Sequence, residues 1–195
     1  MDKLTRSDLY SLEQYAVARP EFRARVMAHK KDLRIPLGDI AALYFEDRLT
    51  MQYQIQEMLR AERIFEAEGI QEELDAYNPL IPDGRNLKAT FMIEVADEHE
   101  RRIVLARLKG IENEVWIRVD GFEPVFAIAD EDLDRENEEK TSSVHFLRFD
   151  LTDEMAAALT AGAALGAGVS QIEYTYQLEP VPENVRISLA ADLDA

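Results

Sequence analysis

The sequence predicts an α+β protein in which a mixed, largely antiparallel sheet packs against a long central helix and several shorter helices. Apolar residues recur at helical spacing between residues 47 and 69, whereas the apolar runs between residues 87 and 178 have the length of strands. Two of these runs flank Asp120-Gly121, a pair that supplies the positive φ angles of a tight hairpin turn. Strands joined by a hairpin favour an antiparallel sheet over a doubly wound parallel one.

The chain is expected to form a single domain, residues 1–195, with a helical N-terminal third (residues 1–76) and a β-rich remainder (residues 87–195). A length of 195 residues is at the upper end of one ordinary domain. The intervening segment contains two prolines and a glycine, which predict a loop. This loop is short and carries apolar side chains that favour burial, so we do not expect it to separate independent domains.

The helical third is predicted to open with two short helices. Thr5 followed by Asp8 is typical of a helix start, and this first helix is expected to reach about Ala18. Pro20 suits the first turn of a second helix, because its missing N–H is not needed there. An apolar run at residues 40–45 then has the length of a buried strand.

The central helix is the strongest helical pattern in the chain. Met51, Ile55 and Leu59 recur at helical spacing within residues 47–69, and Phe65 continues the same apolar pattern. Gly69 is the expected terminator of this helix.

The β-rich remainder is predicted to combine strands with capped helices. Asp97 with Glu100 is expected to cap one helix, Thr152 a second that runs through Leu165, and Pro182 is expected to begin the last helix. Strands are predicted at residues 87–95, 115–119, 125–128, 144–151 and 172–178.

Two local patterns resemble ligand loops but lack their key residues. Gly162, Gly166 and Gly168 are not followed by the Lys-Ser/Thr of a phosphate loop, so they are interpreted as a helix stop and a tight turn. The acidic run at residues 130–139 lacks the central glycine and the final glutamate of a calcium loop. That run is expected to be a solvated loop.

Composition excludes several classes of function. The formal charge is −17, from 39 acidic and 22 basic residues, and such a field repels phosphate backbones and anionic lipids. We therefore expect no nucleic-acid partner and no membrane partner. The absence of cysteine excludes disulfides, thiolate nucleophiles and cysteine-ligated metal centres. Without a secretory pattern at the N-terminus or an apolar run of ~20 residues, a cytoplasmic location is expected.

Glu62 is the first candidate site residue. Met58, Leu59 and Phe65 lie three or four residues away along the predicted helix, which places the Glu62 carboxylate on the apolar side. A buried carboxylate requires a cation, a hydrogen-bond donor or a metal. An internal ion pair with a nearby arginine is the simpler interpretation. Glu57 lies on a more polar flank and either joins this cluster or faces water.

His145 is the second candidate. Strict alternation in residues 144–149 places it on one strand face with Leu147 and Phe149. The imidazole is either a core histidine bonded to a carbonyl or carboxylate, or a metal ligand or proton-transfer group. If Glu57, Glu62 and His145 converged, they would form an oxygen-and-imidazole metal site, but no metal site is assigned from the sequence.

A third possibility is an anion site between the central helix and the sheet. Tyr53, Arg60 and Arg148 could hold an anionic small molecule there.

Several strings resemble an uncharacterised bacterial family of domains of unknown function, the DUF3501-like family. They lie at residues 28–31, 45–50, 53–60, 75–82, 138–141 and 144–149, and so extend over most of the chain. The family brings no catalytic residues to carry over. The resemblance implies genes that often lie beside those of a rubrerythrin-like protein and an iron–sulfur oxidoreductase.

The sequence thus leads to one main functional hypothesis and two alternatives. The main hypothesis is a non-enzymatic binding or accessory protein, a homodimer, that works with a redox protein partner. The alternatives are a metal-dependent enzyme that uses Glu57, Glu62 and His145, and a sensor of an anionic small molecule. The residues do not establish whether the chain is an enzyme, and they name no cofactor.

Overall fold

The computed structural model describes residues 2–129 and 141–194. Helices and antiparallel strands are both abundant in it, which confirms the α+β class. No helix in the described part of the chain is long and apolar enough to cross a membrane. The α-helices are α1 (Leu12–His29), α2 (Arg48–Glu62), α3 (Ala67–Tyr77), α4 (Glu98–Arg107), α5 (Asp153–Thr160) and α6 (Glu183–Ala190).

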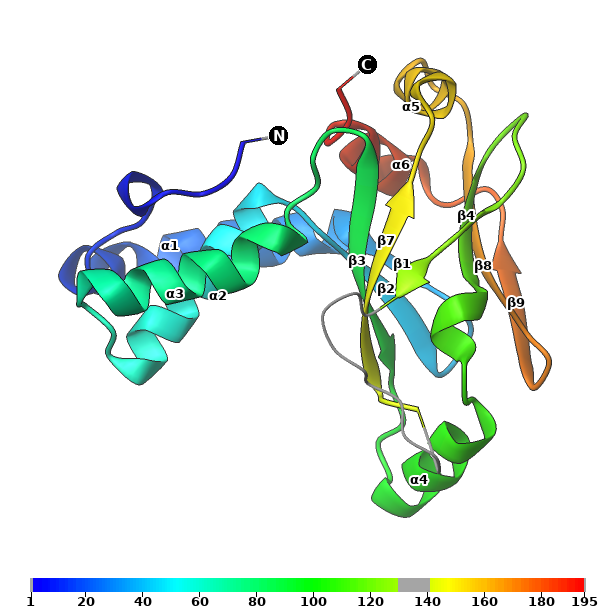
Figure 1. The fold of residues 1–195 in the computed structure, drawn as a ribbon, viewed down its shortest axis with the longest axis horizontal. Helices are drawn as coiled ribbons and strands as arrows, with labels where there is room; N and C mark the ends of the chain where they lie inside the picture. Colours follow the sequence, from blue (N-terminus) through cyan, green and yellow to red (C-terminus); the bar gives the residue numbers. More distant parts are fainter. Residues whose placement is uncertain (1, 130–140, 195) are drawn as a thin grey trace.

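The strands form two antiparallel sheets where one sheet was expected (Figure 1). The five-stranded sheet has the order β1-β2-β3-β7-β6, and the four-stranded sheet has the order β5-β4-β8-β9. Helices α5 and α6 lie at one end of the two sheets and α4 lies at the other (Figure 1). The strands are β1 (Arg34–Pro36), β2 (Ala41–Glu46), β3 (Asn86–Ile93), β4 (Val115–Val119), β5 (Val125–Phe126), β6 (Ile128–Ala129), β7 (Val144–Asp150), β8 (Leu165–Gln171) and β9 (Tyr174–Leu178).

The largest hydrophobic core lies between the two sheets. Because side chains alternate along a strand, one face of each sheet supplies the core and the other face is free for polar residues. In β3 the buried apolar members are Leu87, Ala89, Phe91 and Ile93, and Lys88 and Thr90 between them point to the opposite face. Helices α5 and α6 add further apolar side chains to this core.

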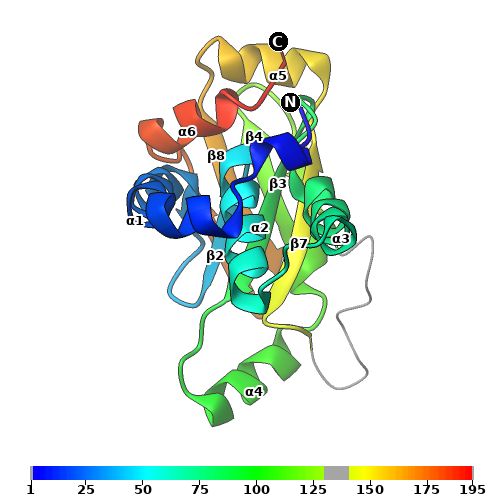
Figure 2. The ribbon, with the colours of Figure 1, turned by 90° about the vertical axis from the view of Figure 1, so that its left-hand side faces the viewer.

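The helical part extends away from the sheets, with α2 lying between α1 and α3 (Figures 1 and 2). One side of α2 packs with α3 and the N-terminal segment, and Met51, Ile55 and Leu59 form the centre of that cluster. The other side contributes Tyr53 to an aromatic cluster with α1. The helical part therefore has its own apolar clusters, separate from the core between the sheets.

The two short helices predicted at the start are wrong. Thr5 and Asp8 do form a capping box, but it closes only a 3₁₀ turn, and one helix then runs from Leu12 to His29 through Pro20. Proline lacks one N–H and disfavours a helix interior. Burial of Tyr15, with Phe22 and Val26, from one face of α1 outweighs that local preference.

The central helix is shorter than predicted. Asp47 caps its start, but α2 ends at Glu62, and the next residue, Arg63, adopts the left-handed conformation with φ 58°. Gly69 lies inside α3, so the prediction that it terminates the central helix is wrong. A side chain at Gly69 would meet the Ile64 side chain at 2.8 Å, so glycine permits this close approach of α3 to the preceding turn.

The predicted helix stop and turn is confirmed at Gly162, which follows α5 with φ 108°, but it is wrong for Gly166 and Gly168. The helix capped by Thr152 ends at Thr160, and Gly166 and Gly168 lie within strand β8. They leave room for neighbouring side chains: a Cβ at Gly168 would lie 2.3 Å from the Trp116 ring. The acidic run at residues 130–139 lies outside the described residues. The hairpin of β4 and β5, the cap at Asp97 and the start of α6 after Pro182 are confirmed.

Candidate functional site

The outer face of the five-stranded sheet carries one row of aligned residues that crosses four strands, and three of its four members are charged. In the strand register Glu46 on β2 lies opposite Lys88 on β3, Lys88 lies opposite Arg148 on β7, and Arg148 lies opposite Ile128 on β6. A carboxylate and two cations are thus neighbours because the pairing of the strands aligns them, although they are far apart in the sequence.

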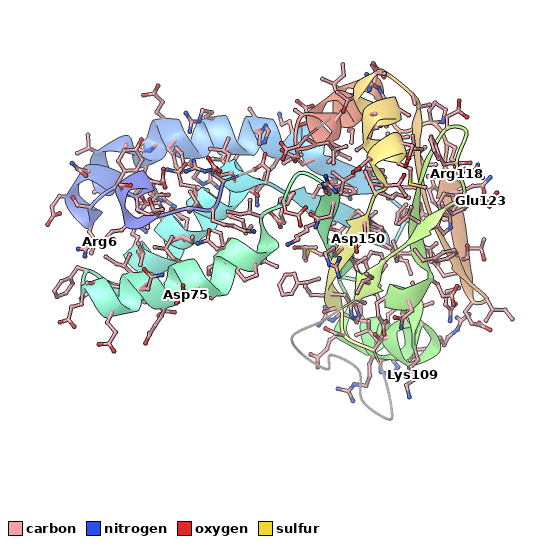
Figure 3. The ribbon with its side chains drawn as sticks, turned by 45° about the horizontal axis from the view of Figure 1, so that its top comes forward. Arg6, Asp75, Lys109, Arg118, Glu123 and Asp150 are labelled. Atoms are coloured by element: carbon pink, nitrogen blue, oxygen red, sulfur yellow. The ribbon has the colours of Figure 1, made fainter. Side chains whose placement is uncertain are left out.

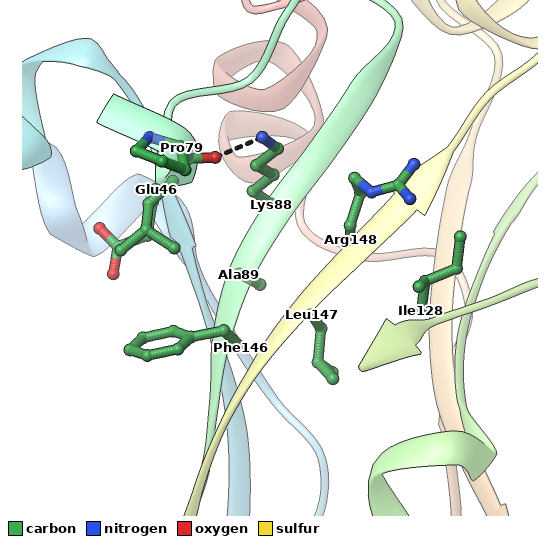
Figure 4. Close-up of a pocket in the computed structure, with 9 residues that line it drawn as sticks. Glu46, Pro79, Lys88, Ala89, Ile128, Phe146, Leu147 and Arg148 are labelled. Carbon is green, nitrogen blue, oxygen red and sulfur yellow. Dashed lines mark hydrogen bonds between the residues drawn. The ribbon is translucent and has the colours of Figure 1, made fainter. Parts of the chain in front are cut away.

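This row forms the floor of a pocket of ≈ 230 Å³ between the sheet and the segment that follows α3 (Figure 4). Pro79 and Leu80 cover one side, and Phe146 and Ile128 add further apolar surface. The pocket therefore combines charged groups with a largely apolar lining, which is the usual composition of a small-molecule site. Its volume is below the roughly 300 to 1,000 Å³ of pockets for drug-sized molecules, so a small ligand fits it better.

Glu46 is the acidic member of the site. Its carboxylate accepts hydrogen bonds from Thr50 Oγ1 at 2.7 Å and from Thr90 Oγ1 at 3.0 Å. Burial raises the pKa of Glu46 above its usual value, and Lys30 and the two threonines oppose this effect only in part. Glu46 is therefore easier to protonate than an exposed glutamate, and in that form it can donate a hydrogen bond.

The cations of the site are held in place by neighbouring oxygen atoms. Lys88 Nζ donates to the carbonyl oxygen of Pro79 (Figure 4). Arg148 pairs with Asp150 on the same strand. Lys3 lies near Lys88. The pKa of the Lys3 ammonium is lowered, mainly by burial and further by the positive charge of Lys88. Positive charge is thus gathered locally, within a chain whose formal charge is −17.

His145 lies on the opposite face of the same sheet. It is fully buried, opposite Phe91 in the register, as alternation with Leu147 predicted. Its Nε2 lies 2.9 Å from Thr141 Oγ1 and 3.0 Å from the carbonyl oxygen of Ser142. The histidine is therefore a hydrogen-bonded core residue, which is the simpler of the two interpretations that its position allowed.

Glu57 belongs to a separate cluster between α1 and α2. Arg19 donates from Nε and Nη2 to its two oxygens at 2.8 Å each, and the Tyr15 hydroxyl donates at 2.6 Å. The Arg19 hydrogen bonds are the main reason that the pKa of Glu57 falls to about 2. Tyr53 is buried beside them against Phe22. This arrangement is an ion pair that fastens α1 to α2.

Glu62 and Arg60 are both exposed to solvent, so the expectation of a buried Glu62 is wrong. Helix α2 ends at Glu62, and the side chain therefore lies beyond the packed face of the helix. Glu57, Glu62 and His145 do not converge. Among the residues that the structure describes, no group of three or more His, Asp or Glu could hold a metal ion. Of the six candidates, only Arg148 lines the pocket.

A second polar cluster, at the junction of the helical part and the sheets, was not predicted from the sequence. His29 at the end of α1 contacts the carboxylate of Asp47, which also accepts from the Thr50 amide at 2.8 Å. Asp192, after α6, is only 8% exposed, and its carboxylate forms no hydrogen bond or ion pair with the described residues. Burial and then Asp47 raise the pKa of Asp192 to about 7.

The fold and the site define a class: an α+β protein with two antiparallel sheets, a helical extension, and a small charged pocket on the outer face of one sheet. The chain belongs to the DUF3501 family, described as a protein of unknown function, whose sequence profile matches residues 3–193. The similarity thus extends over both the helical part and the sheets.

A solved structure agrees with this assignment. It is the crystal structure of a novel protein of unknown function from Burkholderia pseudomallei K96243, with 54% sequence identity and a TM-score of 0.93. The match covers 99% of this chain and 100% of that one. A search of curated proteins finds no significant match. Neither the family nor this structure carries an established enzymatic activity.

Proposed function

We propose that this chain is a non-enzymatic binding protein whose pocket takes a small anion with an apolar part, such as a short-chain carboxylate. The observation that carries the proposal is the alignment of Lys88 and Arg148 with Glu46 along the floor of an otherwise largely apolar pocket. The anionic group would lie against the two cations, where charge-assisted hydrogen bonds form. The apolar part would contact Leu80 and Phe146.

Glu46 supports selection among such anions. When it is protonated it donates a hydrogen bond to an oxygen of the ligand, and when it is ionised it repels a second negative charge. A singly charged ligand is therefore favoured over a multiply charged one. This is the sensor alternative from the sequence, with Arg148 retained and with Lys88 and Glu46 in place of Tyr53 and Arg60.

Straight-chain monocarboxylates and inorganic phosphate should raise the melting temperature to different extents. A ligand present at 100 times its dissociation constant stabilises the folded state by about 2.7 kcal/mol, or about 5 to 10 °C for a protein of this size. Differential scanning fluorimetry across the carboxylate series should show a rise with chain length, because each added methylene contacts the apolar lining. Phosphate should give the smallest shift.

Arg148→Gln should remove most of this ligand-induced shift. Arg118→Gln is the matched control, because Arg118 also lies on a strand and also pairs with an acid, Glu179, but it is on the other sheet. The control variant should keep the full shift. Equal shifts in both variants, or no shift with any carboxylate, would show that the pocket is not a binding site for these anions.

The proposal extends to the assembly of the protein. We propose a cytoplasmic homodimer that acts as an accessory to a redox protein partner, a role supported by the neighbouring genes that the family resemblance implies. Light scattering on the purified protein should give twice the mass of 22.3 kDa. A strictly monomeric protein that retains no redox component during native purification would contradict this part of the proposal.

A further inference from the structure

Phe65 is a large aromatic side chain that the fold leaves in solvent. It is 69% exposed and follows the left-handed turn at Arg63, between α2 and α3. It borders a hollow of ≈ 420 Å³ whose lining also includes Arg6. Figure 3 shows Arg6 near the end of the helical part that is remote from the sheets. The apolar members of that hollow are Leu9, Leu12, Leu59, Ile64 and Ile70.

Negative charge surrounds this exposed apolar surface. Residues 62–77 contain six acidic side chains and one arginine, and α3 itself contains no basic residue. Glu66, Glu68 and Glu72 line a second hollow that Phe65 also borders. None of these six acids forms an ion pair with a residue that the structure describes. The pKa of Glu73 is raised, mainly by burial and further by the negative charges of Glu62 and Glu72. The carboxylates of this surface therefore repel one another.

We propose that this surface, defined by Phe65, the apolar hollow beside it and the acidic residues 62–75, binds a cationic amphipathic segment of a partner protein. Lysine or arginine side chains of the partner would neutralise the carboxylates, and an apolar face would cover Phe65 and fill the hollow. Phe65 is an exposed aromatic residue at the edge of this apolar surface, and large aromatic side chains are common anchors of protein interfaces.

The negative charge of this surface favours a cationic segment over nucleic acid, anionic lipid or a second copy of the chain. Nucleic acid and anionic lipid present phosphates, which the six carboxylates repel. A second copy of the chain would bring an identical acidic face, and like charges across an interface are unfavourable. A cationic segment alone matches both the apolar and the acidic features of the surface.

A fluorescent helical peptide made of leucine and lysine at helical spacing is a direct probe. Fluorescence anisotropy should show binding that weakens about tenfold in Phe65→Ala, a loss of about 1.4 kcal/mol. Glu68→Lys combined with Glu72→Lys should weaken it at least as much. Binding should also fall as salt is added, because exposed charges are screened. The mutated side chains are exposed, so the melting temperatures should not change.

Val17→Ala is the matched control, since Val17 is 85% exposed on α1 and lines none of these hollows. It should leave peptide affinity unchanged, and a peptide of the same composition with its leucines dispersed should bind more weakly. Equal binding of the two peptides, or equal affinity of Phe65→Ala and the native protein, would overturn the proposal. Loss of a dimer in Phe65→Ala would identify a second copy as the occupant and would overturn it too.

Discussion

Gly168→Ala is expected to destabilise the protein by about 3 kcal/mol, near the upper end of the usual effect of overpacking. The added Cβ would lie 2.3 Å and 2.6 Å from two atoms of the Trp116 ring and 2.7 Å from the carbonyl oxygen of Tyr176. Trp116 on β4 is held by a hydrogen bond from its Nε1 to Ser170 at 2.9 Å, so its ring cannot move freely. Urea unfolding at neutral pH measures the loss.

A double variant separates the two contacts. Trp116→Leu removes the ring, so Gly168→Ala should be less costly in that background, although the Tyr176 carbonyl oxygen remains. The difference between the two backgrounds is the energy of the ring contact. If Gly168→Ala changed the free energy of unfolding by less than about 0.5 kcal/mol, as most surface substitutions do, the close packing of β8 against β4 and β9 would be wrong.

Asp192→Asn is expected to stabilise the protein increasingly as the pH rises. In the native chain burial raises the pKa of Asp192 from 3.8 to about 7, so between these values the folded state holds a proton that the unfolded state has lost. The free energy of unfolding must therefore fall as the pH rises through this window, and below it the penalty disappears. The full penalty above pH 7 is on the order of 4 kcal/mol.

The measurement is the difference between the variant and the native chain, from urea unfolding at several pH values from 4 to 8. The difference should be smallest at pH 4 and largest above pH 7. Asp120→Asn is the control, because Asp120 is exposed and asparagine before Gly121 suits the hairpin turn equally well. It should show no such trend. If the difference in free energy of unfolding between Asp192→Asn and the native chain were the same at every pH, burial would not raise the pKa of Asp192, and the prediction would be wrong.

The strand faces were predictable from the sequence. Alternation along β7 places His145 and Arg148 on opposite faces, so the two could never share one site on that sheet. The alternation that places His145 on the same face as Leu147 and Phe149 also places Arg148 outside the core. Arg148 therefore lines the pocket on the outer face, and His145 does not.

The partners of Arg148 could not be predicted in the same way. Glu46 and Lys88 join it because β2 pairs with β3 and β3 pairs with β7 in one particular register. Register depends on contacts between distant segments, which local periodicity does not contain. A single charged residue in an otherwise apolar strand, such as Lys88, was the one indication in the sequence. It predicts that its side chain lies on the outer face of the sheet, but it does not predict which residues of other strands lie beside it.

The error at Glu62 has a local cause. Helical spacing placed it beside Leu59, but this argument holds only while the helix continues. Arg63 is the point at which it stops, and a left-handed arginine is not recognisable from its type, since glycine or asparagine is usual there. Because α2 stops early, Phe65 is exposed instead of buried.

The three apolar clusters of this fold share no buried residue with one another. Detaching the helical part would thus leave the core between the two sheets covered, although the outer face of the five-stranded sheet near Phe146 would lose the cover of Leu80. Glu46 on β2 connects the two regions, because its carboxylate accepts hydrogen bonds from Thr50 on α2 and from Thr90 on β3. Such polar groups can exchange their partners for water at a modest net cost in free energy. The molecule is therefore built for subglobal opening, in which the helices loosen as a cooperative unit while the sheets stay intact.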